Sequence, residues 1–222
     1  MNIAFPENKT HKDKSDVQNQ NRREIVMTTK KKELRKSLLK KRCGLSKEDC
    51  RKLSKIVCKR LTELEIYKHA DTVFAYSSIR NEVSCDYLIE KALSDGKKIA
   101  LPKVINSDND NEMHFFYCNE QENLEEGFMG ISEPKEDYSN LAVPSENTLI
   151  ILPGIAFGRN FGRIGYGKGF YDRYLSLYEE NVQSVAVCYD FQLLDTIPTD
   201  EHDIPSNAIV TPRETLIRGE SL

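Results

Sequence analysis

The sequence contains no apolar run that approaches the ~20 residues needed for a transmembrane helix. Its first residues, Met1 to Pro6, also lack the charged start and long apolar stretch of a secretory signal. An internal repeat is absent as well. We therefore expect a cytoplasmic protein without a membrane partner, and targeting of the polar first segment to an organelle is kept as an alternative.

The six cysteines form no C-x-x-C pair, and no group of Cys and His has the spacing of a zinc site. They stand at positions 43, 50, 58, 85, 118 and 188. Scattered cysteines of this kind are typical of a reducing cytosol, where several fill core or helix positions. We therefore expect free thiols that pack rather than bind metal.

Acidic residues are scarce in one part of the chain. Residues 28–60 carry 14 Lys or Arg against 3 Asp or Glu, a charge of +11, so the remainder carries −14 within a total of −3. A basic segment can serve an anionic ligand or a nucleic acid, but a solvated helix face is the commoner explanation. Aromatic residues are not interleaved with this run, so nucleic acid is not an expected partner. A non-enzymatic nucleic-acid-binding module is the weakest alternative function.

The most informative stretch is rich in glycine, since residues 162–172 read G-R-I-G-Y-G-K-G-F-Y-D. An apolar run at 148–152 precedes it, and a helical pattern at 170–178 follows it. Glycines can adopt positive φ and expose successive N–H groups, and the start of a helix adds free donors. Arg163 and Lys168 supply cations, while Asp172 supplies an oxygen ligand suited to Mg²⁺. We interpret this stretch as a polyphosphate site, most simply a site for ATP.

The stretch fits neither of two familiar phosphate-binding motifs completely. The pattern G-x-x-x-x-G-K is followed by Gly169, so the hydroxyl that a P-loop offers to Mg²⁺ is missing. The dinucleotide pattern G-x-G-x-x-G fails because Phe170 stands at its third glycine. A surface turn without a ligand is the alternative, but the interleaved cations and acid favour a bound anion.

Helical and extended patterns alternate along the chain. Strands are predicted at 72–76, 98–101, 113–117, 148–152, 184–188 and 208–211, the last of which closes the sheet. Helices are predicted at 30–42, at 86–94 and after Ser46, with Leu53, Ile56, Val57, Leu61 and Leu64 as the core stripe of the helix after Ser46. This order predicts one α/β domain over residues 28–222 with a mostly parallel sheet. Residues 1–27 are expected to form a disordered extension.

Several motifs together resemble one known family. Residues 152–157 read L-P-G-I-A-F, and residues 163–173 read R-I-G-Y-G-K-G-F-Y-D-R. Shorter matches are K-K-E-L-R at 31–35, N-E-V at 81–83, L-P at 101–102 and H-D at 202–203. Over residues 28–212 the chain resembles the 5-formyltetrahydrofolate cyclo-ligases, also called 5,10-methenyltetrahydrofolate synthetases. The glycine loop carries most of the specificity of this match.

The resemblance implies a three-layer α/β/α Rossmann-like fold. It also implies a reaction, the ATP-dependent cyclisation of 5-formyltetrahydrofolate to 5,10-methenyltetrahydrofolate. In that reaction the formyl oxygen is phosphorylated, and ADP and phosphate are released. We expect the enzyme to be a monomer whose partners are 5-formyltetrahydrofolate and ATP.

The resemblance also implies roles for individual residues. Lys168 and Arg163 are expected to be catalytic, Glu82 and Ser77 to bind the folate, and Asp172 and Asp203 to hold Mg²⁺. The residues expected to bind ATP are Lys31, Arg35, Arg163, Ile164, Gly165, Tyr166, Gly167, Lys168, Gly169, Phe170 and Tyr171.

Two positions depart from the family pattern. Gly158 stands where the family commonly has Asp, and Phe161 stands where it commonly has glycine, with Gly162 shifted next to Arg163. We therefore expect a reshaped turn ahead of Arg163. Another ATP-dependent kinase or ligase on the same scaffold is the leading alternative function. The dependence of ATP hydrolysis on the added substrate would separate the two.

Overall fold

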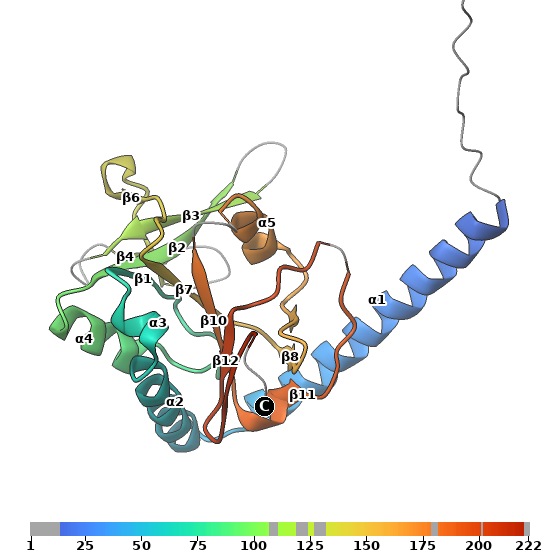
Figure 1. Cartoon of the computed structure of the whole chain (residues 1–222), viewed down its shortest axis with the longest axis horizontal. Coiled ribbons are helices and arrows are strands. Elements are labelled where there is room, and N and C mark those ends of the chain that lie inside the picture. The colour runs from blue at the N-terminus through green and yellow to red at the C-terminus, as the bar shows by residue number, and fades with distance from the viewer. Residues whose placement is uncertain are drawn as a thin grey trace, which may run out of the picture.

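The computed structural model describes residues 14–106, 111–118, 124–126, 132–178, 182–200 and 202–219 (Figure 1). Its helices are α1 (Lys14–Cys43), α2 (Lys47–Thr62), α3 (Glu65–Lys68), α4 (Asp86–Ser94) and α5 (Phe170–Ser176). Its strands are β1 (Thr72–Phe74), β2 (Lys98–Asn106), β3 (Asn111–Tyr117), β4 (Leu124–Glu126), β5 (Ser132–Pro134), β6 (Leu141–Ala142), β7 (Thr148–Leu152), β8 (Ala156–Gly158), β9 (Arg163–Ile164), β10 (Gln183–Val187), β11 (Leu193–Leu194), β12 (Ala208–Val210) and β13 (Thr215–Ile217). Short 3₁₀ helices lie at Tyr138–Asn140 and Asp190–Gln192.

The main sheet has the strand order β13-β12-β10-β7-β1-β2-β3-β6. The central pairings, from β12 through β2, are parallel, and Val73 of β1 lies opposite Ile99 of β2 and Leu149 of β7. The outer pairings are antiparallel. The prediction of a mostly parallel α/β sheet is therefore confirmed. The prediction that residues 208–211 close the sheet is wrong, because β13 pairs outside β12.

Strand β7 lies at the centre of the parallel region, and all five of its residues are buried. Side chains alternate between the two faces of a strand, so Leu149 and Ile151 pack on one face while Ile150 and Leu152 pack on the other. A strand covered on both faces reads as a continuous apolar run rather than an alternating one. This explains why residues 148–152 were recognisable as a strand.

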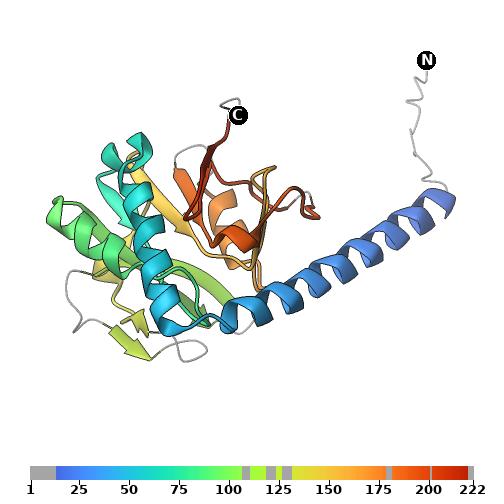
Figure 2. The ribbon, with the colours of Figure 1, turned by 90° about the horizontal axis from the view of Figure 1, so that it is seen from below.

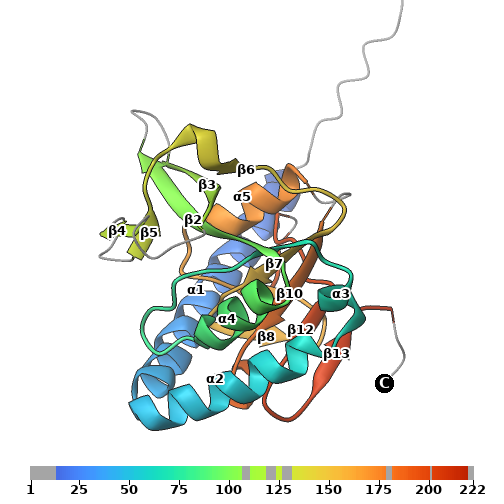
Figure 3. The ribbon, with the colours of Figure 1, turned by 90° about the vertical axis from the view of Figure 1, so that its left-hand side faces the viewer.

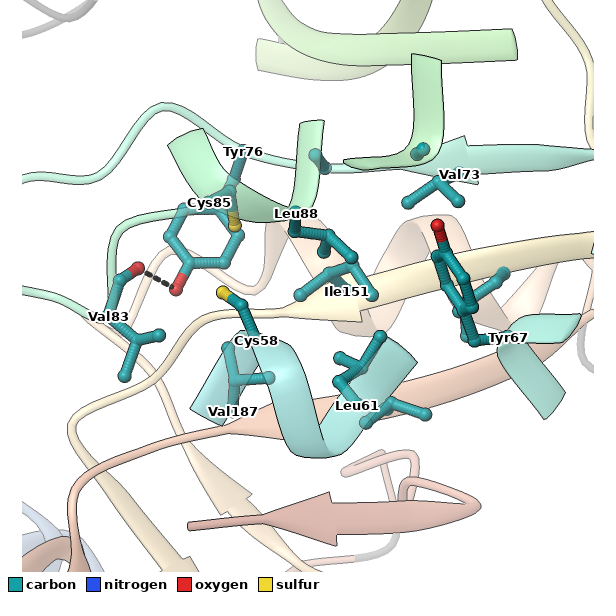
Figure 4. Packing of buried hydrophobic residues seen from close by; sticks show 14 of the residues in the cluster. Cys58, Leu61, Tyr67, Val73, Tyr76, Val83, Cys85, Leu88, Ile151 and Val187 are labelled. Atoms are coloured by element: carbon teal, nitrogen blue, oxygen red, sulfur yellow. Dashed lines mark hydrogen bonds between the residues drawn. The ribbon is translucent and has the colours of Figure 1, made fainter. Parts of the chain in front are cut away.

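Helices cover both faces of this sheet, with α2 and α4 on one side and α5 on the other (Figure 3). Leu61 of α2 and Leu88 of α4 pack around Val73 of β1 (Figure 4). On the opposite face, the ring of Tyr174 on α5 lies 5.0 Å from the ring of Phe115 on β3, measured between centroids. The molecule therefore has the three layers that the sequence predicted.

Helix α1 packs on the small sheet, whose order is β11-β8-β9, rather than on the main one. Leu38 of α1 is buried with Ala156 of β8 and Ile164 of β9. The amino-terminal part of α1 extends past the body of the molecule (Figure 2). None of the helices within the described residues is both long and apolar enough to traverse a bilayer.

The start of α1 differs from the expectation. A helix was predicted only from Lys30, with disorder before it, yet α1 begins at Lys14. Once part of a helix is packed, each added residue gains a hydrogen bond without a new nucleation step, so a polar segment can continue the helix. Residues 1–13 lie outside the described residues.

Helix α2 begins as expected, since Ser46 Oγ accepts a hydrogen bond from Asp49 N at 3.0 Å. Its core stripe was only partly predicted. Val57 and Leu61 are fully buried, but Ile56 is 37% exposed, so the prediction of Ile56 as a core residue is wrong. Adjacent residues in a helix are separated by about 100°, which places Ile56 beside the buried arc rather than on it.

The difference in burial between Leu61 and Ile56 predicts that their truncation to alanine lowers the free energy of unfolding by unequal amounts. Leu61→Ala removes a fully buried side chain and should lower the free energy of unfolding by about 2–5 kcal/mol, because a cavity is left in the core. Ile56→Ala is the matched control and should cost less than about 1 kcal/mol. Urea denaturation of both variants measures the difference. Equal losses would contradict the described packing of α2.

Candidate active site

A cavity of about 860 Å³ opens at the carboxyl ends of the parallel strands. Its wall includes Tyr76 and Ser77 beyond β1, Pro102 in β2, and Pro153 directly after β7. Ligands of open α/β sheets bind at this edge. Every residue that the sequence assigned to a ligand lines this one cavity: Lys31, Arg35, Ser77, Glu82, Arg163, Ile164, Gly165, Tyr166, Gly167, Lys168, Gly169, Phe170, Tyr171, Asp172 and Asp203.

The cavity wall also contains residues that the sequence had not assigned to a ligand. They are Thr28, Tyr76, Ile79, Pro102, Val104, Met113, Glu133, Pro153, Arg173, Ser176, Asp200, His202 and Ile204. Pro102, Val104 and Met113 come from strands β2 and β3, where a core role is the default interpretation. Asp200 could have been assigned from the sequence, because it belongs to the same acidic turn as Asp203, which was expected to bind Mg²⁺.

The glycine loop is shaped by two residues with positive φ, Gly167 at 92° and Gly169 at 68°. Side chains rarely adopt this conformation, so glycine is required at both positions. Two arginines hold the loop from outside. Arg35 Nε donates to Gly165 O at 2.8 Å, and Arg173 Nη1 donates to Lys168 O at 2.8 Å. The loop is thus tied to α1 and to α5.

The turn ahead of Arg163 contains the two departures noted in the sequence. Phe161 has φ 65°, a left-handed conformation that costs a side chain about 1–2 kcal/mol. Gly162 is required for space, because a Cβ there would lie 2.5 Å from Thr199 Cγ2. The left-handed conformation of Phe161 therefore places strain in this turn. The expectation that the turn is reshaped stays a prediction.

Predicted phosphate-binding cations are paired with predicted metal-binding carboxylates. Lys31 Nζ donates to Asp203 Oδ2 at 2.6 Å and to Asp200 Oδ2 at 2.8 Å. Arg163 Nη2 donates to Asp172 Oδ1 at 2.9 Å. Burial acts to lower the pKa of Lys31, but the hydrogen bonds and charges of both carboxylates outweigh it and raise that pKa. Lys31 therefore stays charged in the cavity wall.

The loop still offers donors to an anion. The Nε atom of Arg163 is buried and has no hydrogen-bond partner among the described residues. A buried donor without a partner is costly, so a ligand oxygen there would be stabilising. Lys168 is exposed at the tip of the loop and forms no ion pair with any described residue. Lys168 is thus available to a phosphate group, while Arg163 keeps one buried donor without a partner among the described residues.

Metal binding by the protein alone has little support. Within the described ranges, no three or more His, Cys, Asp or Glu side chains are grouped to hold a metal ion. Mg²⁺ in nucleotide enzymes, however, commonly binds through one or two carboxylates, substrate phosphates and water. Asp172 and Asp203 line the same cavity as the glycine loop and fit that mode of binding.

The carboxylate of Glu82 is held through both of its oxygens. Oε1 accepts from the Tyr166 hydroxyl at 3.0 Å, and Oε2 accepts from Ile79 N at 3.0 Å. Arg42 Nη2 lies 3.6 Å from Oε1 and also donates to the Tyr166 hydroxyl. Burial raises the pKa of Glu82, and the charge of Arg42 opposes this effect. The group is a buried ion pair bridged by a phenol.

The loop that carries Glu82 is tied to the end of α1. Arg80 and Asn81 have φ values of 48° and 58°, and Asn tolerates this region better than most side chains. Asn81 Nδ2 donates to the carbonyls of Leu45 at 3.0 Å and Arg42 at 3.3 Å. Residues far apart in the sequence thereby fix the position of Glu82.

Sequence reasoning missed Arg42, because the basic run was interpreted as a solvated face. A usable signal was nevertheless present. Leu34, Leu38 and Arg42 recur at every fourth residue, so the apolar stripe of α1 continues into this arginine. A cation on the packed face of a helix is expected to be buried and paired.

Comparison with known proteins decides the family. Residues 27–212 match the model of the 5-formyltetrahydrofolate cyclo-ligase family. A probable 5-formyltetrahydrofolate cyclo-ligase of Schizosaccharomyces pombe is 33% identical over 174 residues, which are 72% of this chain and 84% of that protein. The 5-formyltetrahydrofolate cyclo-ligase of Escherichia coli K12 is 34% identical over 144 residues, 64% of this chain and 79% of that protein. The chain belongs to this family.

Solved structures agree with this assignment. The 5,10-methenyltetrahydrofolate synthetase of Aquifex aeolicus superposes with a TM-score of 0.71 at 35% identity, covering 86% of this chain and 95% of that one. The resemblance inferred from the glycine loop is therefore confirmed. As a 5-formyltetrahydrofolate cyclo-ligase family member, the chain falls in an ATP-dependent enzyme class, which confirms the expectation of an enzyme.

The buried Glu82 of this cyclo-ligase predicts a pH effect on stability. An acid whose pKa is raised by folding binds protons more tightly in the native state, so stability falls as pH rises above its unfolded pKa of 4.5. Relative to Glu82→Gln, the wild type should therefore lose unfolding free energy as the pH rises above about 4.5. Urea midpoints at several pH values give this difference. Parallel pH dependences in both proteins would contradict the raised pKa.

Proposed function

We propose that this cyclo-ligase converts 5-formyltetrahydrofolate and ATP to 5,10-methenyltetrahydrofolate, ADP and phosphate in the cavity described above. The observation that carries this proposal is that one cavity is lined by both the cationic glycine loop and the buried Glu82. Transfer between two substrates requires that both be held in one site with reacting atoms in contact. Family membership supplies the identity of the two substrates.

The chemistry explains why ATP is needed. The carbon of the N5-formyl group is a poor electrophile, and its oxygen is a poor leaving group. Transfer of the γ-phosphoryl group to that oxygen gives a phosphorylated imidate and ADP. The neighbouring N10 amine of the same folate then attacks the carbon and loses its proton, and phosphate departs with the former formyl oxygen. Because the attack is intramolecular, it needs no protein nucleophile.

The cationic residues align and neutralise the triphosphate. Arg163 and Lys168 contact the transferring group from the glycine loop, and Lys31 and Arg35 reach it from α1. Charge developing on the phosphoryl oxygens is stabilised best by donors that are already in place. Lys31 and Arg163 exchange carboxylate partners for phosphate oxygens when ATP binds, which is consistent with their present ion pairs.

The folate occupies the other part of the cavity. Glu82 orients the pterin and formyl end, and Ser77 lies beside the substrate at the end of the same loop. Pro102, Val104 and Met113 line this cavity and can pack against the flat apolar faces of a pterin. The folate and the triphosphate are thereby held in the same cavity.

Asp172 and Asp203 would hold Mg²⁺ together with the phosphates. The ion, when bound, neutralises phosphate charge and fixes the geometry of the triphosphate. We further propose that the enzyme is a cytoplasmic monomer. Sedimentation of the purified protein and fractionation of cells would test these two properties independently of the reaction.

The exposed loop cation gives the first test of the mechanism. Lys168→Ala should lower turnover by about two to three orders of magnitude, the usual loss when one preorganised charge-stabilising donor is removed. Lys52→Ala, an exposed lysine on α2 outside the cavity wall, is the matched control and should keep normal turnover. Formation of the conjugated methenyl product from 5-formyltetrahydrofolate and Mg-ATP is followed in the near ultraviolet.

Each result of that assay is informative. A near-normal rate in Lys168→Ala would remove Lys168 from the mechanism. ATP binding by the wild type without methenyl product would discard the folate reaction and favour a kinase or ligase with another acceptor. ATP hydrolysis measured against a panel of acyl and phosphoryl acceptors would then identify the substrate.

The proposed metal ligands predict a change in magnesium dependence. Asp172→Asn should raise the Mg²⁺ concentration for half-maximal activity on the order of 10-fold or more, because a charged oxygen ligand is lost. Asp195→Asn is the control, since the Asp195 side chain is 99% exposed and lies outside the cavity wall. An unchanged magnesium requirement in Asp172→Asn would remove this residue from the metal site.

A further inference from the structure

Arg42 is the buried junction of several segments that form the cavity, although it does not line the cavity itself. Its side chain is 1% exposed. Its guanidinium donates from Nη1 to Gly154 O at 2.7 Å, from Nε to Arg80 O at 3.0 Å, and from Nη2 to the Tyr166 hydroxyl. These acceptors follow β7, follow β1 and lie in the glycine loop, respectively. One side chain of α1 thus contacts three of the segments that frame the cavity.

The charge of Arg42 also requires a partner. A buried guanidinium is costly unless an opposite charge and full hydrogen bonding accompany it. The carboxylate of Glu82 lies 3.6 Å away, and the Tyr166 hydroxyl bridges the two by accepting from Arg42 and donating to Glu82. Hydrogen bonds to charged groups are stronger than neutral ones, so this chain restrains the carboxylate closely.

We propose that Arg42 is a positioning residue for the folate substrate, which acts through Tyr166 and Glu82 by fixing the orientation and balancing the charge of the Glu82 carboxylate in the cavity. This inference rests on the proposed role of Glu82 in the function above. It adds a residue of α1 that touches neither substrate. It also gives Tyr166 a second role, because its hydroxyl links the nucleotide loop to the folate end.

The nucleotide end has its own supports. Arg35 holds the carbonyl of Gly165, and Arg173 holds the carbonyl of Lys168. Neither contact involves Arg42, so the backbone of the glycine loop keeps its restraints when Arg42 is replaced. Loss of Arg42 should therefore weaken folate binding much more than ATP binding. A general loss of structure would weaken both.

A double-mutant cycle tests whether Arg42 acts through Glu82. The proteins are wild type, Arg42→Met, Glu82→Gln and the double variant, and calorimetry measures the binding of 5-formyltetrahydrofolate without ATP. Each single variant should bind the folate about 10- to 100-fold more weakly, the scale found when a hydrogen-bonded partner that orients a metal-binding side chain is removed. The double variant should bind no more weakly than Glu82→Gln, because residues in one network are not additive.

Arg60→Met is the matched control. Arg60 also joins a helix end to loop carbonyls, with bonds to Pro212 O at 3.1 Å and Arg213 O at 3.0 Å, but it lies outside the cavity wall. This variant should keep wild-type folate binding. The KM for ATP should change less than about threefold in Arg42→Met, since ATP contacts are retained.

Several results would overturn the inference. Losses that multiply in the double variant would show that Arg42 acts independently of Glu82, and unchanged folate binding in Arg42→Met would show that it does not position the substrate. If Arg42→Met fails to fold, the same cycle is run with Tyr166→Phe, which keeps the ring and removes only the bridging hydroxyl. Additive losses there would equally reject the proposal.

Different results would reject the role of Arg42 and the proposed reaction. Wild-type protein that binds 5-formyltetrahydrofolate but forms no methenyl product would reject the reaction and leave the cycle interpretable. Normal turnover with additive losses in the cycle would reject the role of Arg42 alone. Wild-type protein that does not bind the folate would reject both.

Discussion

Burial of β7 on both faces is the constraint on which the architecture depends. Since its side chains need cover in both directions, α2 and α4 must lie on one side and α5 on the other. The chain leaving β7 then enters the β8–β9 hairpin before it reaches α5, so the glycine loop sits beyond the edge of the sheet. The cavity lies at this edge, and residues of α1, of the loop after β1 and of the glycine loop form its wall. The position of the site thus follows from where the core ends.

Much of this fold could be predicted from local signals. The apolar run of β7, the Ser46 cap and the alternation of strands and helices each depend on neighbouring residues only. The features that were missed depend on partners far along the chain. Strand β13 is recognisable only through its pairing with β12, and the small sheet only through the packing of α1 against it. The exposure of Ile56 likewise reflects which arc of α2 meets the sheet.

The cavity wall was predicted more fully than the framework behind it. Glycines with interleaved cations indicate phosphate chemistry from the sequence itself, and the family resemblance added Lys31, Glu82 and Asp203, which line the same cavity. The partners of these residues could not be predicted. Asp200 meets Lys31 across 169 positions of sequence, and Arg42 meets Tyr166 across 124. Charge on a helix usually indicates a solvated face, so the basic run as a whole concealed Arg42, and only the spacing of Leu34, Leu38 and Arg42 along one face of α1 set it apart.

In the proposed nucleotide site, carboxylates already neutralise Lys31 and Arg163. A triphosphate that binds there replaces carboxylates that already contact the cations, so little water has to be removed from Lys31 and Arg163. The free energy gained on binding is then the difference between a phosphate ion pair and a carboxylate ion pair. Replacement of both ion pairs takes several phosphate oxygens at once. The proposed site would therefore select a polyphosphate over a small anion such as the free phosphate that the proposed reaction releases.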